Sequence, residues 1–164
     1  MALRLSKIIM CLSLAAFAFL VTFGNITDYG SNFAFVQHVL SMDTTFPGNA
    51  LMYRSITSPF VWHLGYWLII VGEGLTCILF LVASWRLWSA RHGSAAAFNQ
   101  AKSGVVVAAT MGFLVWYVGF MVIGGEWFAM WQSDTWNGQD AAFKFYMTIL
   151  AVLIFVNQSD PELA

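Results

Sequence analysis

Charged residues are scarce in this sequence, and their scarcity excludes most classes of soluble protein. Only 9% of the 164 residues are Asp, Glu, Lys or Arg, whereas 60% are hydrophobic. A soluble domain has roughly a quarter of its residues charged, because its surface must be covered by groups that water solvates. The composition therefore predicts an integral membrane protein.

Several kinds of functional motif are also missing. The few Lys and Arg residues form no basic run and the formal net charge is −1, so nucleic acid is excluded as a partner. The two cysteines, Cys11 and Cys77, lie in apolar segments without CxxC spacing, which indicates small buried hydrophobes. No Ser or Cys has a base at a recognisable spacing, so the balance is against an enzyme that uses nucleophilic catalysis.

Long apolar runs are what the sequence has in abundance. A helix needs about 20 apolar residues to cross a hydrocarbon core of about 30 Å. Four segments are candidates for membrane spans: residues 8–24, 60–84, 103–127 and 141–156. Arg4 and Lys7 before the first run would also fit a signal peptide, but the run ends without a small-x-small cleavage site and a polar mature start, so we expect a span. The predicted fold is an all-α bundle of four transmembrane helices, with residues 1–164 as a single membrane domain.

The basic residues predict the orientation of this bundle. Arg4 and Lys7 precede the first span, while Arg86, Arg91 and Lys102 lie between the second and third spans. Loops on the cytoplasmic side of a membrane carry an excess of Lys and Arg. Both termini are therefore expected to be cytoplasmic.

The outer loop between the first two spans, residues 25–59, is too long to be a plain connector. Within it, residues 31–42 and 48–56 each have the pattern of a short amphipathic helix, and the turn "TTFPGN" separates them. We expect both helices to lie in or near the outer membrane interface.

Glu73 lies almost at the middle of the second span, in "YWLIIVGEGLT". The ends of this span are marked by interfacial tryptophans, Trp62 and Trp67 on one side and Trp85 and Trp88 on the other. An ionised carboxylate near the bilayer centre is costly unless it has partners, so Glu73 should face the bundle interior and be neutral or hydrogen-bonded.

Two interpretations of Glu73 remain open at this point. With Tyr66 and His63 it is a candidate for binding a ligand or a proton, because ionisable groups within a membrane often have such roles. A buried Glu that is hydrogen-bonded to another helix is also ordinary packing. Comparing Glu73→Gln with Glu73→Leu separates these interpretations.

Small residues form a stripe along the third span. The stripe consists of Gly104, Ala108, Gly112 and Gly119. Such a stripe lets another helix approach closely. Helix packing is the expected use, and we also take these residues as candidates for contact with a partner subunit.

The outer side of the protein offers weaker candidates. His38, Asp43 and Glu126 have side chains that bind metals, but their spacing matches no metal motif. Three tryptophans follow the third span, Trp127, Trp131 and Trp136. They are typical of an interfacial aromatic belt and also form a rim that a partner protein or a lipid headgroup would contact.

The amino-acid sequences of three segments resemble those of a known protein family. These are "FGNITDYGSNFAFVQHVLSMDTTFPGNALMYRSITSP", "YWLIIVGEGLT" and "GFMVIGGEWFAMWQSDTWNGQDAAF". They resemble the bacterial family of predicted small integral membrane proteins of unknown function, over nearly the whole chain. The resemblance implies a multi-pass protein of the bacterial inner membrane with four spans, and it supplies no catalytic residue and no cofactor.

Two functions follow as expectations. The first is an accessory or structural subunit of a larger membrane complex, respiratory or photosynthetic, with lipids and other membrane subunits as partners. The alternative is a membrane protein that binds a quinone, a lipid or a metal through Glu73 in the bundle interior.

Overall fold

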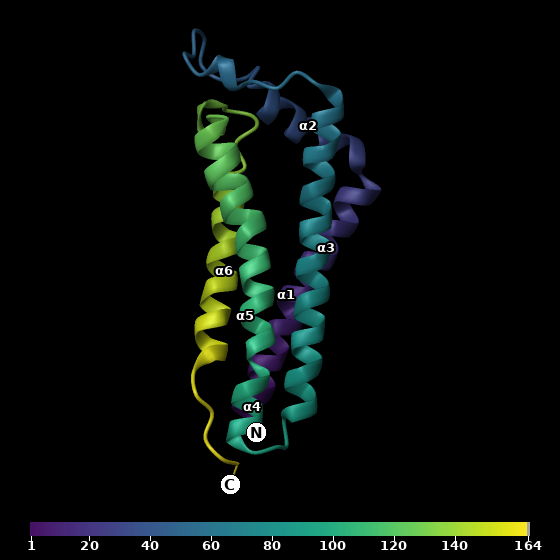
Figure 1. The fold of residues 1–164 in the computed structure, drawn as a ribbon, viewed down its shortest axis with the longest axis vertical. Helices are drawn as coiled ribbons and strands as arrows, with labels where there is room; N and C mark the ends of the chain where they lie inside the picture. The colour runs from purple at the N-terminus through teal and green to yellow at the C-terminus, as the bar shows by residue number, and fades with distance from the viewer. Residues whose placement is uncertain (164) are drawn as a thin grey trace.

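Four long apolar helices run along the length of the molecule in the computed structural model, which describes residues 1–163 (Figure 1). Their bounds are Ala2–Thr27 for α1, Pro59–Ala90 for α3, Ala95–Trp127 for the third span and Gln139–Asn157 for α6. No strand occurs within the described residues. The four-helix fold and all four predicted spans are thus confirmed.

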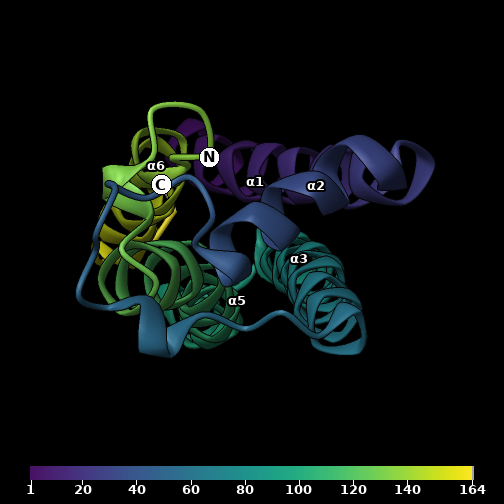
Figure 2. The same cartoon turned by 90° about the horizontal axis from the view of Figure 1, so that it is seen from above.

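The helices are arranged as a ring when viewed along the bundle (Figure 2). In order around the ring, α1 packs on α3, α3 on the third span, and the third span on α6, which returns to α1. The first and last described residues lie at the same end of the molecule (Figure 1), as an even number of crossings requires. We call this the terminal end.

Helix boundaries follow the local signals in the sequence. Ser58 is the N-cap of α3 and Pro59 occupies its first turn, where a missing N–H costs nothing. Ser94 caps α4 (Ala95–Ala101) by accepting a hydrogen bond of 3.2 Å from the Ala97 N–H.

The third span changes its winding halfway along. It consists of α4, α5 (Ser103–Phe113) and a π-helical stretch, η2 (Leu114–Trp127). The π-type spacing is visible at the end of η2, where the Phe128 N–H donates to the Ile123 carbonyl at 3.0 Å. The two glycines on either side of this change have different surroundings, since a Cβ at Gly112 would lie 2.7 Å from Ile149 Cδ1 whereas Gly119 has open space around it.

A cap closes the end opposite the termini. It is formed by residues 28–58 and 128–138, and it contains α2 (Tyr29–Ser41), η1 (Met52–Arg54) and η3 (Met130–Gln132). Its own small core consists of Val39, Met42, Phe128, Ala129 and Met130. The predicted helix over residues 31–42 is confirmed as α2.

The second helix predicted for the outer loop, over residues 48–56, is wrong. Only the single 3-10 turn η1 forms there. Gly48 has φ = 76° and the Asn49 side chain accepts a hydrogen bond from the Leu51 N–H, which favours a turn over a helix start. The Ile56 N–H then donates to the Leu40 carbonyl at 2.8 Å and fixes the loop against α2.

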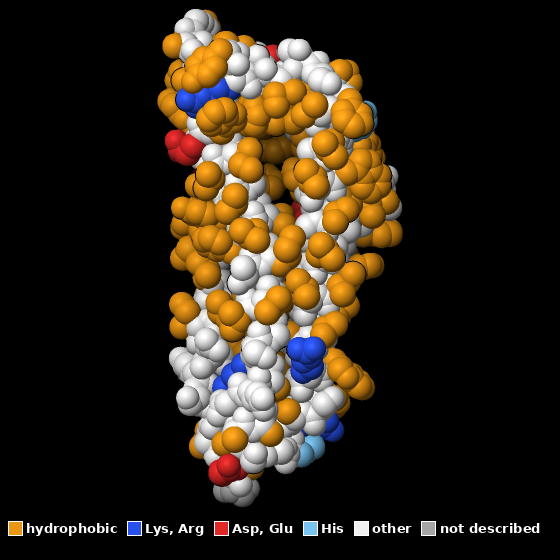
Figure 3. Space-filling model, in the orientation of Figure 1, with side chains coloured by type: hydrophobic (Ala, Val, Ile, Leu, Met, Phe, Trp, Pro, Cys, Tyr) orange, Lys and Arg blue, Asp and Glu red, His pale blue; other side chains and the backbone are white. Residues whose placement is uncertain are grey.

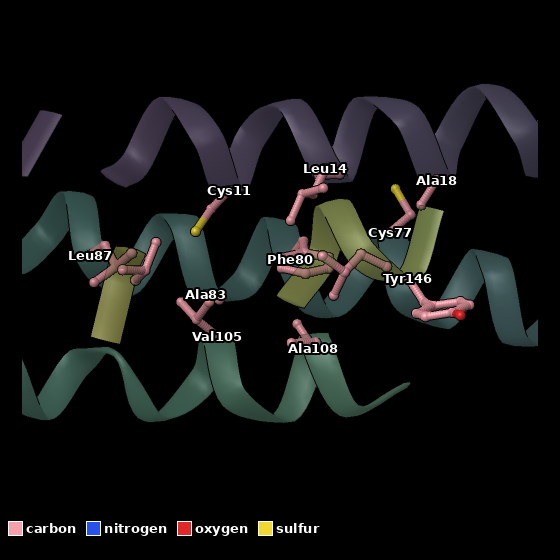
Figure 4. Close-up of a cluster of buried hydrophobic side chains, with 14 of the residues drawn as sticks. Cys11, Leu14, Ala18, Cys77, Phe80, Ala83, Leu87, Val105, Ala108 and Tyr146 are labelled. Carbon is pink, nitrogen blue, oxygen red and sulfur yellow. The ribbon is translucent and has the colours of Figure 1, made fainter. Parts of the chain in front are cut away.

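Small side chains allow the helices to pack closely in the centre of the bundle. Figure 4 shows Cys11, Leu14 and Ala18 of α1 facing α3, whose Phe80 and Ala83 lie between α1 and α5. Both cysteines are buried and unbonded. Glu73 is buried as predicted, together with Tyr66 and Cys77 on the same side of α3, whereas Leu68, Leu75 and Val82 are exposed.

Candidate functional site

Glu73 is hydrogen-bonded to α1 of the same chain. The Asn25 side chain, in the last turn of α1, donates a hydrogen bond of 2.7 Å from Nδ2 to Glu73 Oε2. The Tyr66 hydroxyl donates to the Asn25 carbonyl at 2.9 Å and lies 3.3 Å from Asn25 Oδ1. Two of the predicted site residues, Glu73 and Tyr66, therefore meet at Asn25, which the sequence analysis did not single out.

His63 belongs to a neighbouring aromatic cluster. Its Nδ1 is 2.7 Å from the Tyr29 hydroxyl, and its ring stacks on Phe33 with 4.2 Å between the centroids. The Tyr29 ring also contacts Tyr66, at 4.8 Å between centroids. His63 thus reaches Tyr66 through an aromatic contact, and no hydrogen bond within residues 1–163 joins it to Glu73.

The geometry at Glu73 predicts a difference between two substitutions. Glu73→Leu leaves the half-buried Asn25 amide without an acceptor, which is expected to lower the free energy of unfolding by about 1 kcal/mol. Glu73→Gln keeps an acceptor for Asn25 and is expected to stay close to the wild type. Unfolding in mixed micelles titrated with SDS measures both, and equal losses for the two variants would contradict the role of this hydrogen bond.

An apolar cavity of about 380 Å³ lies beside this cluster, between α3 and η2. Figure 3 shows the surface hollowed there, directly below the cap. Every residue that lines the cavity is apolar or glycine; examples are Val36 and Leu40 of α2, Leu68 of α3, Val118 and Ile123 of η2, and Met130 of η3. The cavity is suited to a hydrocarbon chain and offers no polar group to a headgroup.

Glycines shape the walls of this cavity. Gly72 brings α3 close to η2, since a Cβ at Gly72 would lie 2.7 Å from Val115 Cγ2. Gly119 of η2 leaves open space, because the nearest atom to a Cβ at this position is the Leu114 carbonyl oxygen at 3.9 Å. Glu73 follows Gly72 directly but faces α1, and it does not line the cavity.

The predicted stripe of small residues is used inside the chain. Gly104 packs on Ala83 of α3, and Ala108 is fully buried. A Cβ at Gly112 would lie 2.7 Å from Ile149 Cδ1 of α6. These three positions mediate packing between helices of this chain.

The metal candidates do not come together. His38 Nδ1 lies 2.9 Å from both carboxylate oxygens of Asp43, and the His38 ring stacks on Trp136 at 4.7 Å between centroids. Glu126 is not part of this pair, and residues 1–163 contain no group of three His, Cys, Asp or Glu side chains suited to a metal.

The three tryptophans after the third span have different environments. Trp136 is half-buried against the cap, whereas Trp127 and Trp131 are about half exposed. Arg54 lies over the Trp127 ring at 4.6 Å and donates to the Trp127 carbonyl at 3.2 Å. An exposed aromatic rim remains at Trp127 and Trp131.

A second polar cluster, at the terminal end, was missed by the sequence analysis. Lys7 and Lys102 both contact Asp160 Oδ2, at 2.6 and 2.5 Å, and all three side chains are almost completely buried. Arg4 is also buried and donates to the carbonyls of Gly93, Arg91 and Pro161. In the sequence these basic residues were used only to predict orientation. The contact of Lys7 and Lys102 with Asp160 could not be predicted, because Asp160 lies more than fifty residues away from each of them.

The two lysines also change the acidity of Asp160. Burial alone would raise the pKa of this carboxyl, but the hydrogen bonds and charges of Lys102 and Lys7 outweigh burial and hold the pKa below its usual value. Asp160 is therefore an ionised anchor at neutral pH.

Comparison with known proteins gives one match. The family model described as "Predicted small integral membrane protein (DUF2165)" matches residues 3–159. Searches of curated proteins and of solved structures give no significant match. Because the match covers nearly the whole chain, and because four helices are long and apolar enough to span a membrane, the chain belongs to this family of predicted small integral membrane proteins.

Proposed function

We propose that this protein binds the hydrocarbon chain of a membrane amphiphile, a lipid or an isoprenoid quinone, in the cavity between α3 and η2. The cavity itself carries the proposal. Its volume of about 380 Å³ and its wholly apolar lining are typical of sites for small apolar ligands.

The surroundings of the cavity support binding of a defined chain over loose contact with bulk lipid. The cap covers one end of the cavity with Phe128 and Met130, which belong to its own packed core. Gly119 leaves open space on the η2 side of the cavity, and Gly72 brings the α3 side close to η2. A chain would enter sideways from the bilayer, with its polar end toward the cap.

Glu73 has a positioning role in this proposal. The Asn25–Glu73 hydrogen bond holds α1 against α3 next to Gly72, which is part of the cavity wall. The carboxylate thus supports the wall from behind and does not contact the bound chain.

Filling the cavity tests the proposal. Gly119→Leu places a side chain in the open space of the cavity, and a bound chain would then be overpacked, at a cost of about 1–3 kcal/mol. Binding of a fluorescent fatty acid to the protein in nanodiscs is expected to weaken about tenfold or more.

The matched control is Gly24→Leu on α1. Gly24 is also a helical glycine with open space around it, and it does not line the cavity. This variant should bind the probe like the wild type. Equal binding by both variants and the wild type would contradict the proposed site.

The exposed rim favours a second function, that of a subunit in a larger membrane complex, respiratory or photosynthetic. Phe46, Tyr53, Trp127 and Trp131 are large apolar side chains exposed on or beside the cap, and such patches often mediate protein contacts. Extraction in mild detergent followed by native gel electrophoresis should then show the protein co-migrating with larger subunits. A lone monomer in several mild detergents would count against this role.

We also propose an orientation of the protein in the membrane. We place the protein in the bacterial inner membrane with both termini in the cytoplasm. The concentration of basic residues at the terminal end supports this orientation; they are Arg4, Lys7, Arg86, Arg91 and Lys102.

A further inference from the structure

The segment that follows α6 has one buried side chain, and hydrogen bonds from Arg4, Lys7 and Lys102 to its backbone carbonyls also hold it. Residues 158–163 contain no helix and run across the terminal end (Figure 1). Among them only Asp160 is buried, while Gln158, Ser159 and Pro161 are exposed. Asp160 is therefore the one side chain of the segment that an incoming anion would have to displace from the interior.

The anchor lies between two cations of different helices. Lys7 of α1 and Lys102, between α4 and α5, meet at Asp160 Oδ2, and both also donate to the Gln158 carbonyl at 2.6 Å. Two ammonium groups that converge in this way repel each other unless an anion lies between them. The helices therefore form a site for an anion, and the 158–163 segment supplies that anion.

The negative charge of Asp160 does not balance the positive charges of the basic side chains at this site. Arg4, Lys7 and Lys102 are three buried cations, and within residues 1–163 Asp160 is the one carboxylate that forms an ion pair with any of them. Two polar atoms of this cluster are buried without a hydrogen-bond partner, Arg4 Nε and Asp160 Oδ1. The Asp160 carboxylate therefore does not satisfy the Arg4 Nε–H, and an oxyanion with its oxygens in a different arrangement would be able to accept from it.

The depth of the site matches the headgroup region of a membrane. Trp85 and Trp88, which are exposed on the last turns of α3, mark an interface at the terminal end. The site lies at the adjoining ends of α1 and α6. Basic pockets between helices at this level bind the phosphates of anionic lipids.

We propose that Arg4, Lys7 and Lys102 form a binding site for a phosphate-class oxyanion, and that Asp160 occupies this site as an internal ligand which the oxyanion displaces. The phosphate of an anionic lipid headgroup and free phosphate share the required chemistry. Displacement releases residues 158–163 from α1 and α5. This site is independent of the cavity under the cap, at the opposite end of the bundle.

Mobility of the segment in the folded, full-length protein tests displacement directly. Ser159→Cys provides an exposed thiol for a spin label, since both native cysteines are buried. The labelled protein is placed in nanodiscs of phosphatidylcholine, in nanodiscs containing phosphatidylglycerol, and in phosphatidylcholine nanodiscs with inorganic phosphate. We expect a several-fold larger mobile fraction with phosphatidylglycerol, with inorganic phosphate, or with both, and the two arms identify the source of the oxyanion.

A label at His92→Cys is the matched control. His92 is exposed at the same end of the molecule but does not belong to the segment, so its mobility should be the same in all three conditions. Equal mobility of the Ser159 label in the three conditions would overturn the proposal. A parallel rise of both labels would overturn it as well, because it would show a general loosening of the terminal end.

A second measurement uses retention of lipid. Asp160→Asn removes the internal anion and keeps the shape of the side chain, so native mass spectrometry should show several-fold more phosphatidylglycerol retained than in the wild type. Glu162→Gln is the control, because Glu162 accepts only an exposed hydrogen bond from the Ala95 N–H. The same retention in both variants would contradict the site.

Discussion

Replacing Asp160 with alanine is expected to lower the free energy of unfolding by about 3–5 kcal/mol at neutral pH. The substitution leaves the ammonium groups of Lys7 and Lys102 buried and close together without an anion. Removing one partner of a buried ion pair is costly for this reason, even where the pair itself contributes little. SDS-induced unfolding in mixed micelles measures the difference.

The difference in stability between the wild type and Asp160→Ala is also expected to depend on pH. The folded protein holds the pKa of Asp160 below the ordinary value of 3.8. Its ionised form therefore stabilises the protein fully above the unfolded pKa, and the contribution is lost as the pH falls through the folded pKa. The gap between wild type and Asp160→Ala should be constant from about pH 6 to 8 and shrink below about pH 4.

Glu162→Ala is the matched control for Asp160→Ala. It removes a neighbouring carboxylate whose hydrogen bond is exposed, and an effect below about 0.5 kcal/mol is expected. If both variants lose the same stability, the loss reflects the segment as a whole and the buried ion pairs do not carry it.

Trp116→Ala is expected to cost about 3–5 kcal/mol, the range for removing a large buried aromatic side chain. Trp116 is 1% exposed and joins three helices, with ring centroids 5.6 Å from Phe17 of α1 and 5.9 Å from Phe145 of α6. No neighbouring side chain can close the space, since these rings are fixed by their own packing. The cavity left behind separates η2 from both α1 and α6.

Trp85→Ala is the control for this substitution. Trp85 is 69% exposed on α3, so its removal leaves no internal cavity. An equal loss of stability for both variants would contradict the role assigned to Trp116. A change in probe binding by Trp116→Ala alone would further show that the packing of η2 supports the cavity wall.

Much of the bundle could be predicted because its signals are local. Apolar length predicts each span, since no other structure satisfies the backbone in lipid. Pro59 marks the start of α3 through its ring, and Ser94 marks the start of α4 through its capping side chain. The buried face of α3 follows from helical spacing, because Tyr66, Glu73 and Cys77 recur on one side.

The errors arose where neighbouring residues decide the conformation. The π-helical winding of η2 was not predicted, because a stripe of small residues does not show how many residues each turn contains. The segment at 48–56 has the pattern of a helix, but Gly48, Asn49 and the contact with Leu40 hold it as a turn and a loop.

The sequence by itself determined that this chain is a four-span membrane protein with a carboxylate facing the bundle interior. Tertiary structure decided what that carboxylate touches, because Asn25 lies on a different helix and its approach to Glu73 depends on how α1 packs on α3. It also decided the cavity at Gly119 and the convergence of Lys7, Lys102 and Asp160. These features join residues that are distant in the sequence, and only the packing of the helices brings them together.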